Sequence, residues 1–296
     1  MTPATVPGDH CSPELTGRLT DMSTTPPVYR HTLTARELRK RRILRRFLYS
    51  QLALRQGLLI ALGRESPLVP FTVEADPPSV YWVFRLRDGI ADSLPGRLGL
   101  PTGITPVAVR VLPDDERQFL LTLNVYRVSG ITNGMRAEWS IYVDDPHTGV
   151  PRYLVLDARS STRSMDPIDI FTPASTVRHE RDGRQLTTTV GDRPGGFECR
   201  LTLPDAMSDL PSVSCAPEWV SANDNIYWAN GVCDRTFYDA GLAHPSMIRL
   251  GADDVSIDDG SRWADLIEPD PVHVLVYRDA IEFVVSPWDN IEQLTR

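Results

Sequence analysis

Charged and hydroxyl side chains alternate with apolar ones in residues 135–143 (MRAEWSIYV) of the sequence. Successive side chains of a β-strand point to opposite faces, so Arg136, Glu138, Ser140 and Tyr142 would share one face. A carboxyl group beside a guanidinium can move a proton while the cation polarises a carbonyl group or holds a carboxylate. We therefore predict that Glu138 is a general acid or base and that Arg136 holds an anionic group.

The two flanking segments, 118–129 (QFLLTLNVYRVS) and 152–159 (RYLVLDAR), predict strands that pair with 135–143. Side chains on one face of paired strands lie within contact distance, so polar residues of these segments could join the same site. The polar residues that they add are Thr122, Asn124, Tyr126, Asp157 and Arg159. We expect Arg159 to be a second fixed cation of the site. We expect Asn124, Tyr126 and Asp157, with Tyr142, to bind substrate.

The same alternation has a simpler interpretation, in which the polar face lies in water. Antiparallel sheets often have one solvated face, and Arg136 with Glu138 would then form a surface ion pair of little energetic value. The two interpretations differ in the curvature of the sheet, because one face of a closed or cone-like barrel lines its interior. An exposed Glu138 would remove the proposed site.

Two further segments have compositions that suit ligand binding. Residues 157–167 (DARSSTRSMDP) are dense in hydroxyls and charges after an apolar strand, as binding loops or surface turns are. Residues 223–235 (NDNIYWANGVCDR) combine amides with Tyr227, Trp228 and Asp234, which suits either a lid over a ligand or a hydrogen-bonded turn.

Several chemistries lack their sequence motifs in this chain. It contains no G-x-S-x-G, G-x-x-x-x-G-K-[ST], G-x-G-x-x-G or H-E-x-x-H motif, and its six histidines never pair at metal-ligand spacing. The acidic cluster within 253–259 does not match a calcium loop, so a solvated loop is the preferred interpretation. We expect no metal and no cofactor.

Lys40 is the only lysine among the 31 cationic residues of the chain. A Schiff base requires a neutral amine, and arginine cannot replace lysine in that role because its pKa is too high. Since Lys40 lies among charged residues, we predict that no buried site of this protein uses a lysine Schiff base.

Period-two hydrophobicity from about residue 80 onward predicts a mainly antiparallel β protein of the α+β class. The segments 118–129, 135–143 and 152–159 would form a meander. Further strands are expected at 176–180, 185–190, 197–203, 273–277 and 281–285. The proline- and glycine-rich segment 204–271 is expected to wrap the sheet with loops or short helices.

The N-terminal part of the chain differs in composition from the rest. Residues 1–30 predict a disordered tail, 31–66 a basic amphipathic helix opened by the capping pair Thr34 and Glu37, and 67–296 a β-barrel domain that binds a small molecule. The basic helix could dock on its own core, on a second subunit, on an acidic partner or on an anionic membrane.

The overall composition restricts the partners of the chain. A net charge of −8 argues against nucleic acid, and 41% hydrophobic with 24% charged residues is typical of a soluble globular protein. Four scattered cysteines favour a reducing compartment. We find neither an apolar leader segment nor a run of about 20 apolar residues. We therefore expect a cytoplasmic protein without an integral membrane segment. Assembly into a homo-oligomer is left open.

The order of three motifs resembles the acetoacetate decarboxylase-like superfamily. They are LGLPTGITPV at 98–107, the strand pair QFLLTLNVYRVSGI and MRAEWSIYV, and RYLVLDARSSTRSMDP at 152–167. In that family the third motif carries Gly-Arg-Glu and then the lysine that forms the Schiff base. Here Ala158 and Arg159 align with Gly-Arg, Ser160 replaces the glutamate, and Asp166 falls near the missing lysine.

The resemblance implies a cone-like antiparallel barrel around a cavity used for small keto or enol compounds. Without the lysine, it implies an enzyme of secondary metabolism that uses acid–base chemistry, of the lyase, dehydratase or cyclase type. Glu138 would be its general acid or base, and Arg136 and Arg159 would hold an anion or enolate. Two other hypotheses remain. One is a non-catalytic binding protein for an apolar molecule, with Met135, Trp139 and Ile141 lining the cavity. The other is an assembly subunit that docks through the basic helix.

Overall fold

The computed structural model describes residues 71–100, 103–130, 133–144, 151–162, 171–173, 177–191, 196–220, 224–229, 232–240, 246–261, 263–285 and 290–293. The predicted tail at 1–30, the basic helix at 31–66 and Lys40 lie outside these residues. No helix within the described ranges combines the length and the apolar character needed to cross a membrane.

Strands dominate the described part of the chain, with little helix, as the period-two pattern predicts. In chain order the elements are β1 (Phe71–Val73), β2 (Val80–Leu86), α2 (Ile90–Leu98), β3 (Thr105–Pro106), β4 (Leu120–Gly130), β5 (Gly134–Asp144), β6 (Pro151–Ser160), β7 (Phe171–Pro173), β8 (Arg178–Asp182), β9 (Gln185–Val190), β10 (Phe197–Thr202), η1 (Met207–Asp209), α3 (Pro217–Val220), β11 (Asp224–Ala229), β12 (Val232–Ala240), β13 (Met247–Arg249), η2 (Ala252–Asp254), β14 (Val255–Asp259), β15 (Ile267–Tyr277), β16 (Ile281–Val285) and β17 (Asn290–Gln293).

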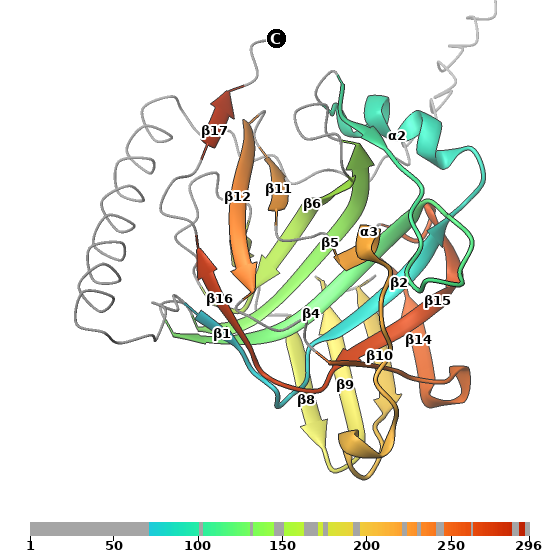
Figure 1. Ribbon diagram of the computed structural model, residues 1–296, viewed down its shortest axis with the longest axis vertical. Coiled ribbons are helices and arrows are strands. Elements are labelled where there is room, and N and C mark those ends of the chain that lie inside the picture. The colour runs from blue at the N-terminus through green and yellow to red at the C-terminus, as the bar shows by residue number, and fades with distance from the viewer. Residues whose placement is uncertain are drawn as a thin grey trace, which may run out of the picture.

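The larger of the two sheets has 13 strands and curves into a half-barrel (Figure 1). Its strand order is β13-β15-β2-β4-β1-β16-β12-β11-β6-β5-β3, and β4 pairs also with β5. The strands β4, β1, β16, β12, β11, β6 and β5 therefore each pair with the next, and β5 pairs again with β4. The described pairings are antiparallel except those of β6 with β11 and with β7. The predicted meander is confirmed as β4, β5 and β6.

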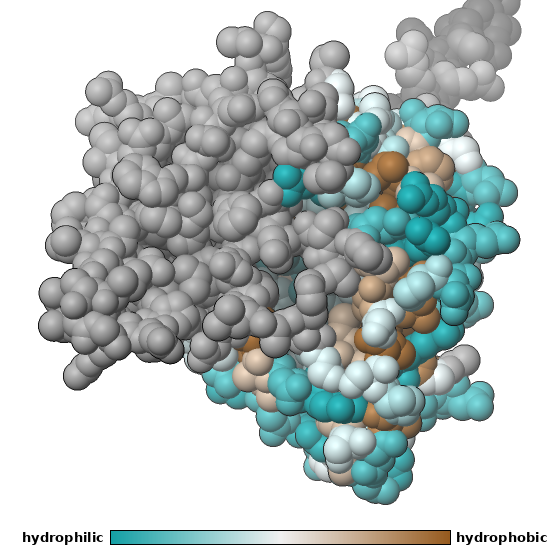
Figure 2. Space-filling view, viewed as in Figure 1, coloured by the Kyte–Doolittle hydropathy of each residue, from teal (hydrophilic) through white to brown (hydrophobic). Residues whose placement is uncertain are grey.

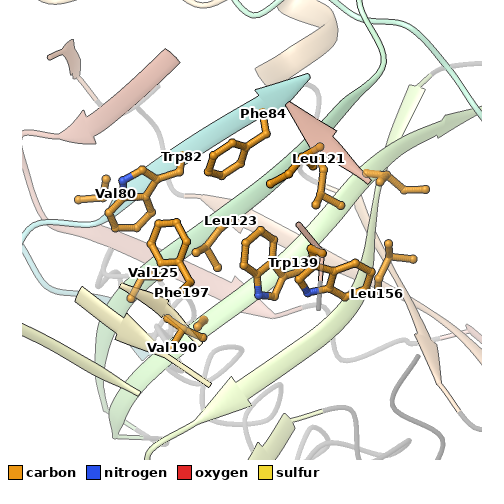
Figure 3. Close-up of a cluster of buried hydrophobic side chains, with 14 of the residues drawn as sticks. Val80, Trp82, Phe84, Leu121, Leu123, Val125, Trp139, Leu156, Val190 and Phe197 are labelled. Carbon is orange, nitrogen blue, oxygen red and sulfur yellow. The ribbon is translucent and has the colours of Figure 1, made fainter. Parts of the chain in front are cut away.

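The second sheet has four strands in the order β14-β10-β9-β8 and covers one face of the larger sheet. Large aromatic side chains fill the space between the sheets: Trp82, Phe84, Trp139 and Phe197 meet there (Figure 3). The centroid of the Phe197 ring lies 5.2 Å from that of the Trp82 ring and 5.9 Å from that of the Trp139 ring, and both contacts are edge-on. This apolar layer holds β2, β4 and β5 in place.

The outer surface of the described residues is mostly hydrophilic in the view of Figure 2, with small hydrophobic areas. Phe119 is the one large hydrophobic side chain of the described ranges that is exposed.

The structure corrects two expectations about elements. The segment 204–271 contains the strands β11 to β14, and β11 and β12 belong to the larger sheet, although we expected loops or short helices. The helix α2 was not expected. Its buried Ala91, Leu94 and Leu98 follow helical spacing, but Pro95 and Gly96 inside it mask the signal.

Candidate active site

Both faces of β5 are buried, which settles the choice between the two interpretations of its alternating pattern. Trp139 and Ile141 pack into the apolar layer between the sheets. On the opposite face, Arg136 and Glu138 are each only 3% exposed, and Ser140 is fully buried. The interpretation in which this polar face lies in water is therefore wrong.

Glu138 accepts a hydrogen bond from the phenol of Tyr126, with 2.6 Å between Oη and Oε1. Because β4 and β5 are antiparallel neighbours, Tyr126 stands directly opposite Arg136, and Asn124 stands opposite Glu138. The Oγ of Ser79 donates to the side-chain oxygen of Asn124 over 3.1 Å. The antiparallel register thus brings four of the predicted side chains together.

Burial is the main influence on the carboxyl group of Glu138. Removal from water penalises the charged form and raises the pKa of Glu138 to about 7, while the Tyr126 hydrogen bond and the Arg136 charge act in the opposite direction. At neutral pH the group is therefore present in both protonation states. This is the property that a general acid or base requires.

Three further phenols lie on the same face of the sheet as Glu138. Tyr81 of β2, Tyr153 of β6 and Tyr277 of β15 all have a raised pKa, chiefly because they are buried. The charge of Glu138 contributes to the rise for Tyr81 and Tyr153. All three therefore stay neutral and can donate hydrogen bonds.

These three tyrosines were not among the site residues expected from the sequence. Tyr153 lies inside a predicted strand and could have been found from its parity. Tyr81 and Tyr277 come from β2 and β15, whose pairing brings Leu275 opposite Tyr81 and is not readable from the sequence. The two rings lie 5.5 Å apart, edge-on.

The pairing of β6 with β5 corrects the expected position of Asp157 and Arg159. The register shifts between Trp139 and Ser140, so that Ser140 stands opposite Val155 but Trp139 stands opposite Asp157. A bulge of this kind inserts one extra residue and reverses the parity beyond it. Asp157 and Arg159 therefore align with the Trp139 face of β5, where Arg159 Nε lies 3.3 Å from Asp157 Oδ2.

Tyr142 lies on the same face as Glu138, at the opposite end of the strand from Arg136. Its ring packs edge-on against Tyr153 at 5.4 Å, and its hydroxyl donates to the carbonyl oxygen of Trp219 over 3.4 Å. Tyr142 is buried in an apolar cluster with Val155 and Met247. This hydroxyl is already engaged by the protein backbone.

Two further segments were expected to bind a ligand, 157–167 and 223–235. Of the first, residues 163–167 lie outside the described residues. Residues 224–229 and 232–235 form parts of β11 and β12, so this segment is neither a lid nor a turn along most of its length. Within the described ranges, no group of three or more His, Cys, Asp or Glu side chains could hold a metal ion.

No protein-family model and no curated protein matches the sequence. Solved structures similar to this chain include the acetoacetate decarboxylase of Legionella pneumophila subsp. pneumophila str. Philadelphia 1, with 10% identity, a TM-score of 0.48, and coverage of 75% of this chain and 87% of that one. The enduracididine biosynthesis enzyme MppR with HEPES buffer bound has 10% identity, a TM-score of 0.46, and coverage of 75% and 86%.

An acetoacetate decarboxylase-like enzyme from Sphingomonas wittichii RW1 is also similar, with 10% identity, a TM-score of 0.37, and coverage of 75% of this chain and 92% of that one. The superfamily that the sequence resembles thus recurs among the structural neighbours.

Proposed function

We propose that this chain is an enzyme that acts on a small keto or enol compound by acid–base chemistry, with Glu138 as the group that moves the proton. The observation that supports this most is a buried carboxyl group whose pKa is raised to about 7, placed beside a phenol and a guanidinium. Such a shift is typical of catalytic acids and bases.

The proposal places the reaction inside the curved sheet. The pairings from β4 through β1, β16, β12, β11, β6 and β5 back to β4 would enclose the face that carries Glu138 as the interior of a barrel. A chamber lined by Arg136 and neutral phenols would exclude bulk water, which strengthens every charge interaction inside it.

The proposed first step is enolisation. The Glu138 carboxylate removes a proton from the carbon beside a carbonyl group, the electron pair of that C–H bond forms the new C=C bond, and the carbonyl π pair moves to oxygen. The phenols stabilise the oxygen of the resulting enolate, and Arg136 holds the carboxylate of a substrate that carries one. The enolate then takes the proton back, expels a leaving group, or attacks an electrophile within the same molecule, as in isomerases, dehydratases and cyclases.

This chemistry requires no amine that attacks the carbonyl carbon. The described ranges contain no lysine, and Lys40, the only lysine of the chain, lies in the segment predicted as a charged helix. We therefore propose that catalysis proceeds without a Schiff base. Borohydride treatment in the presence of 2-oxobutyrate should leave the intact mass unchanged, whereas a reduced adduct on Lys40 would contradict this part of the proposal.

Exchange of carbon-bound hydrogen tests the proposed step directly. The protein is incubated with 2-oxobutyrate or 2-butanone in D2O, and the loss of the C3 proton signal is followed by proton NMR. Wild-type protein should accelerate exchange, and Glu138→Gln should reduce the enzyme-catalysed rate by about 100-fold or more. Glu198→Gln, at a partly exposed position on the four-stranded sheet, is the matched control. Unchanged exchange in Glu138→Gln would exclude Glu138 as the base.

The binding-protein hypothesis gains no support from the structure. It expects Trp139 and Ile141 to line a cavity, but both pack in the layer between the two sheets. The assembly hypothesis concerns residues 31–66, outside the described ranges.

A further inference from the structure

We propose that Thr122, Ser140 and Tyr153 form a subsite that hydrogen-bonds the carbonyl oxygen of the substrate while Glu138 moves the proton. This inference rests on the proposed function and assigns part of the substrate to a place on the sheet.

The three residues come from three adjacent strands and face the same side. Thr122 of β4 stands directly opposite Ser140 of β5, and Ser140 stands opposite Val155, two residues beyond Tyr153 on β6. The side chains of Thr122 and Ser140 are fully buried, and Tyr153 is 4% exposed. The strand pairing therefore gathers three hydroxyl groups in one buried place.

The three hydroxyls lack well-formed hydrogen bonds within the described part of the chain. No partner that meets full hydrogen-bond geometry is found there for Thr122 Oγ1, Ser140 Oγ or Tyr153 Oη. Burial raises the pKa of Tyr153, and side-chain hydrogen bonding with Ser140 and Thr122 acts against that rise, so the three hydroxyls lie close enough to interact although their geometry is poor. Buried hydroxyls are costly without partners, and native proteins nearly always satisfy them.

The charges around the subsite indicate what it binds. All three groups are neutral, and the nearby charge that affects Tyr153 is that of Glu138, which would repel an anion. On β5, Glu138 lies between the other two side chains: Ser140 follows it by two residues, and Arg136 precedes it by two residues. A carboxylate would therefore bind at Arg136, and a neutral carbonyl oxygen at the hydroxyls.

Such an arrangement favours the transition state of enolisation. Negative charge develops on the carbonyl oxygen only as the proton leaves, and donors placed in advance around that oxygen stabilise it most at that moment. Tyr153, as a neutral phenol, supplies the more acidic donor, and the two aliphatic hydroxyls complete the shell.

The test uses Thr122→Val, Ser140→Ala and Tyr153→Phe, each of which removes one hydroxyl with little change in shape. Exchange at C3 of 2-butanone and of 2-oxobutyrate is followed by proton NMR, and thermal unfolding is measured in parallel. Removal of one oxyanion donor typically reduces kcat by about 100-fold, so Tyr153→Phe should lose about that much with both probes. The melting temperature should hold or rise by about 2 to 4 °C, because an unpaired hydroxyl has gone.

Thr189→Val and Ser256→Ala make the same chemical changes on the four-stranded sheet and serve as controls. If the three site variants exchange both probes as fast as wild type while Glu138→Gln does not, the subsite is wrong and the proposed function stands.

A crystal structure of the wild-type protein with 2-butanone provides a readout that does not depend on turnover. The carbonyl oxygen should lie within hydrogen-bond distance of at least two of the three hydroxyls. Ketone bound there by a protein that catalyses no exchange supports the subsite and contradicts the proposed function. Ketone absent from the subsite, or bound with its oxygen elsewhere, overturns the subsite.

Discussion

Tyr126 and Glu138 are joined by a 2.6 Å hydrogen bond that crosses the β4–β5 ladder diagonally, since each residue stands directly opposite a different partner. The phenol stabilises the ionised carboxylate, and burial opposes it more strongly. This balance places the pKa of a buried carboxyl group near neutral pH.

Tyr126→Phe removes the hydrogen bond but keeps the ring. Since that bond lowers the pKa of Glu138, its loss should raise the pKa further, by about one unit for a hydrogen bond to a charged group. The pH at which deuterium exchange reaches half of its maximum should move upward by the same amount. An unchanged midpoint, with a folded variant, would mean that another group controls the profile.

Arg136→Gln removes the cation that we place beside Glu138. The pKa of Glu138 should rise, because the Arg136 charge lowers it. The variant should also lose any preference for 2-oxobutyrate over 2-butanone, since only the keto acid carries a carboxylate.

Arg159→Gln is the matched comparison for Arg136→Gln, because the bulge in β6 aligns Arg159 with the other face of the sheet. Its ratio of exchange rates for the two probes should equal that of wild type. If Arg159→Gln changes the ratio as much as Arg136→Gln does, the face assignment beyond the bulge is wrong.

Glu138→Gln should change the dependence of stability on pH. A carboxyl group with a pKa of about 7 in the folded state, against 4.5 in the unfolded state, contributes stability below pH 4.5 that is lost as the pH rises to about 7, in total about 3 kcal/mol. The glutamine variant should lack this loss and gain about that much relative to wild type between pH 4 and pH 8. Urea unfolding at a series of pH values measures it, and parallel curves would contradict the buried, protonated glutamate.

His179 should have the opposite effect. Its Nε2 donates to the carbonyl oxygen of Pro78 and its Nδ1 accepts from Thr188, each at 2.7 Å, and burial lowers the pKa of His179 to about 4. The unfolded chain takes up the proton first, so the stability is fully present above pH 6.5 and is lost toward pH 4, by about 3 kcal/mol.

The Glu138→Gln background removes the opposing slope and exposes this effect. There, free energies of unfolding should fall between pH 6.5 and pH 4. Addition of His179→Gln should flatten that fall, even though the double variant is less stable at neutral pH. A slope that His179→Gln leaves unchanged would assign the acid sensitivity to other groups.

The sequence alone determined which side chains of β5 share a face. Alternation in a strand is a property of the backbone, so Arg136, Glu138 and Ser140 had to point one way and Trp139 the other once the segment was extended. The same local rule located the meander. It also predicted β9 and β16 with the bounds that the structure has, 185–190 and 281–285. Only the alternation within each segment was needed.

Tertiary structure decided the rest, because it depends on contacts between segments far apart in the chain. A second sheet covers the apolar face of β5, and the polar face is buried as well, so Glu138 is buried where a sheet with one solvated face would leave it in water. The bulge in β6 reverses the parity of Asp157 through one unpaired position that no alternation pattern records. Tyr81 comes beside Glu138 through the pairing of β2 with β4, because Tyr81 stands opposite Asn124 and Asn124 stands opposite Glu138. Burial and register together select this pairing of segments that lie far apart in the chain.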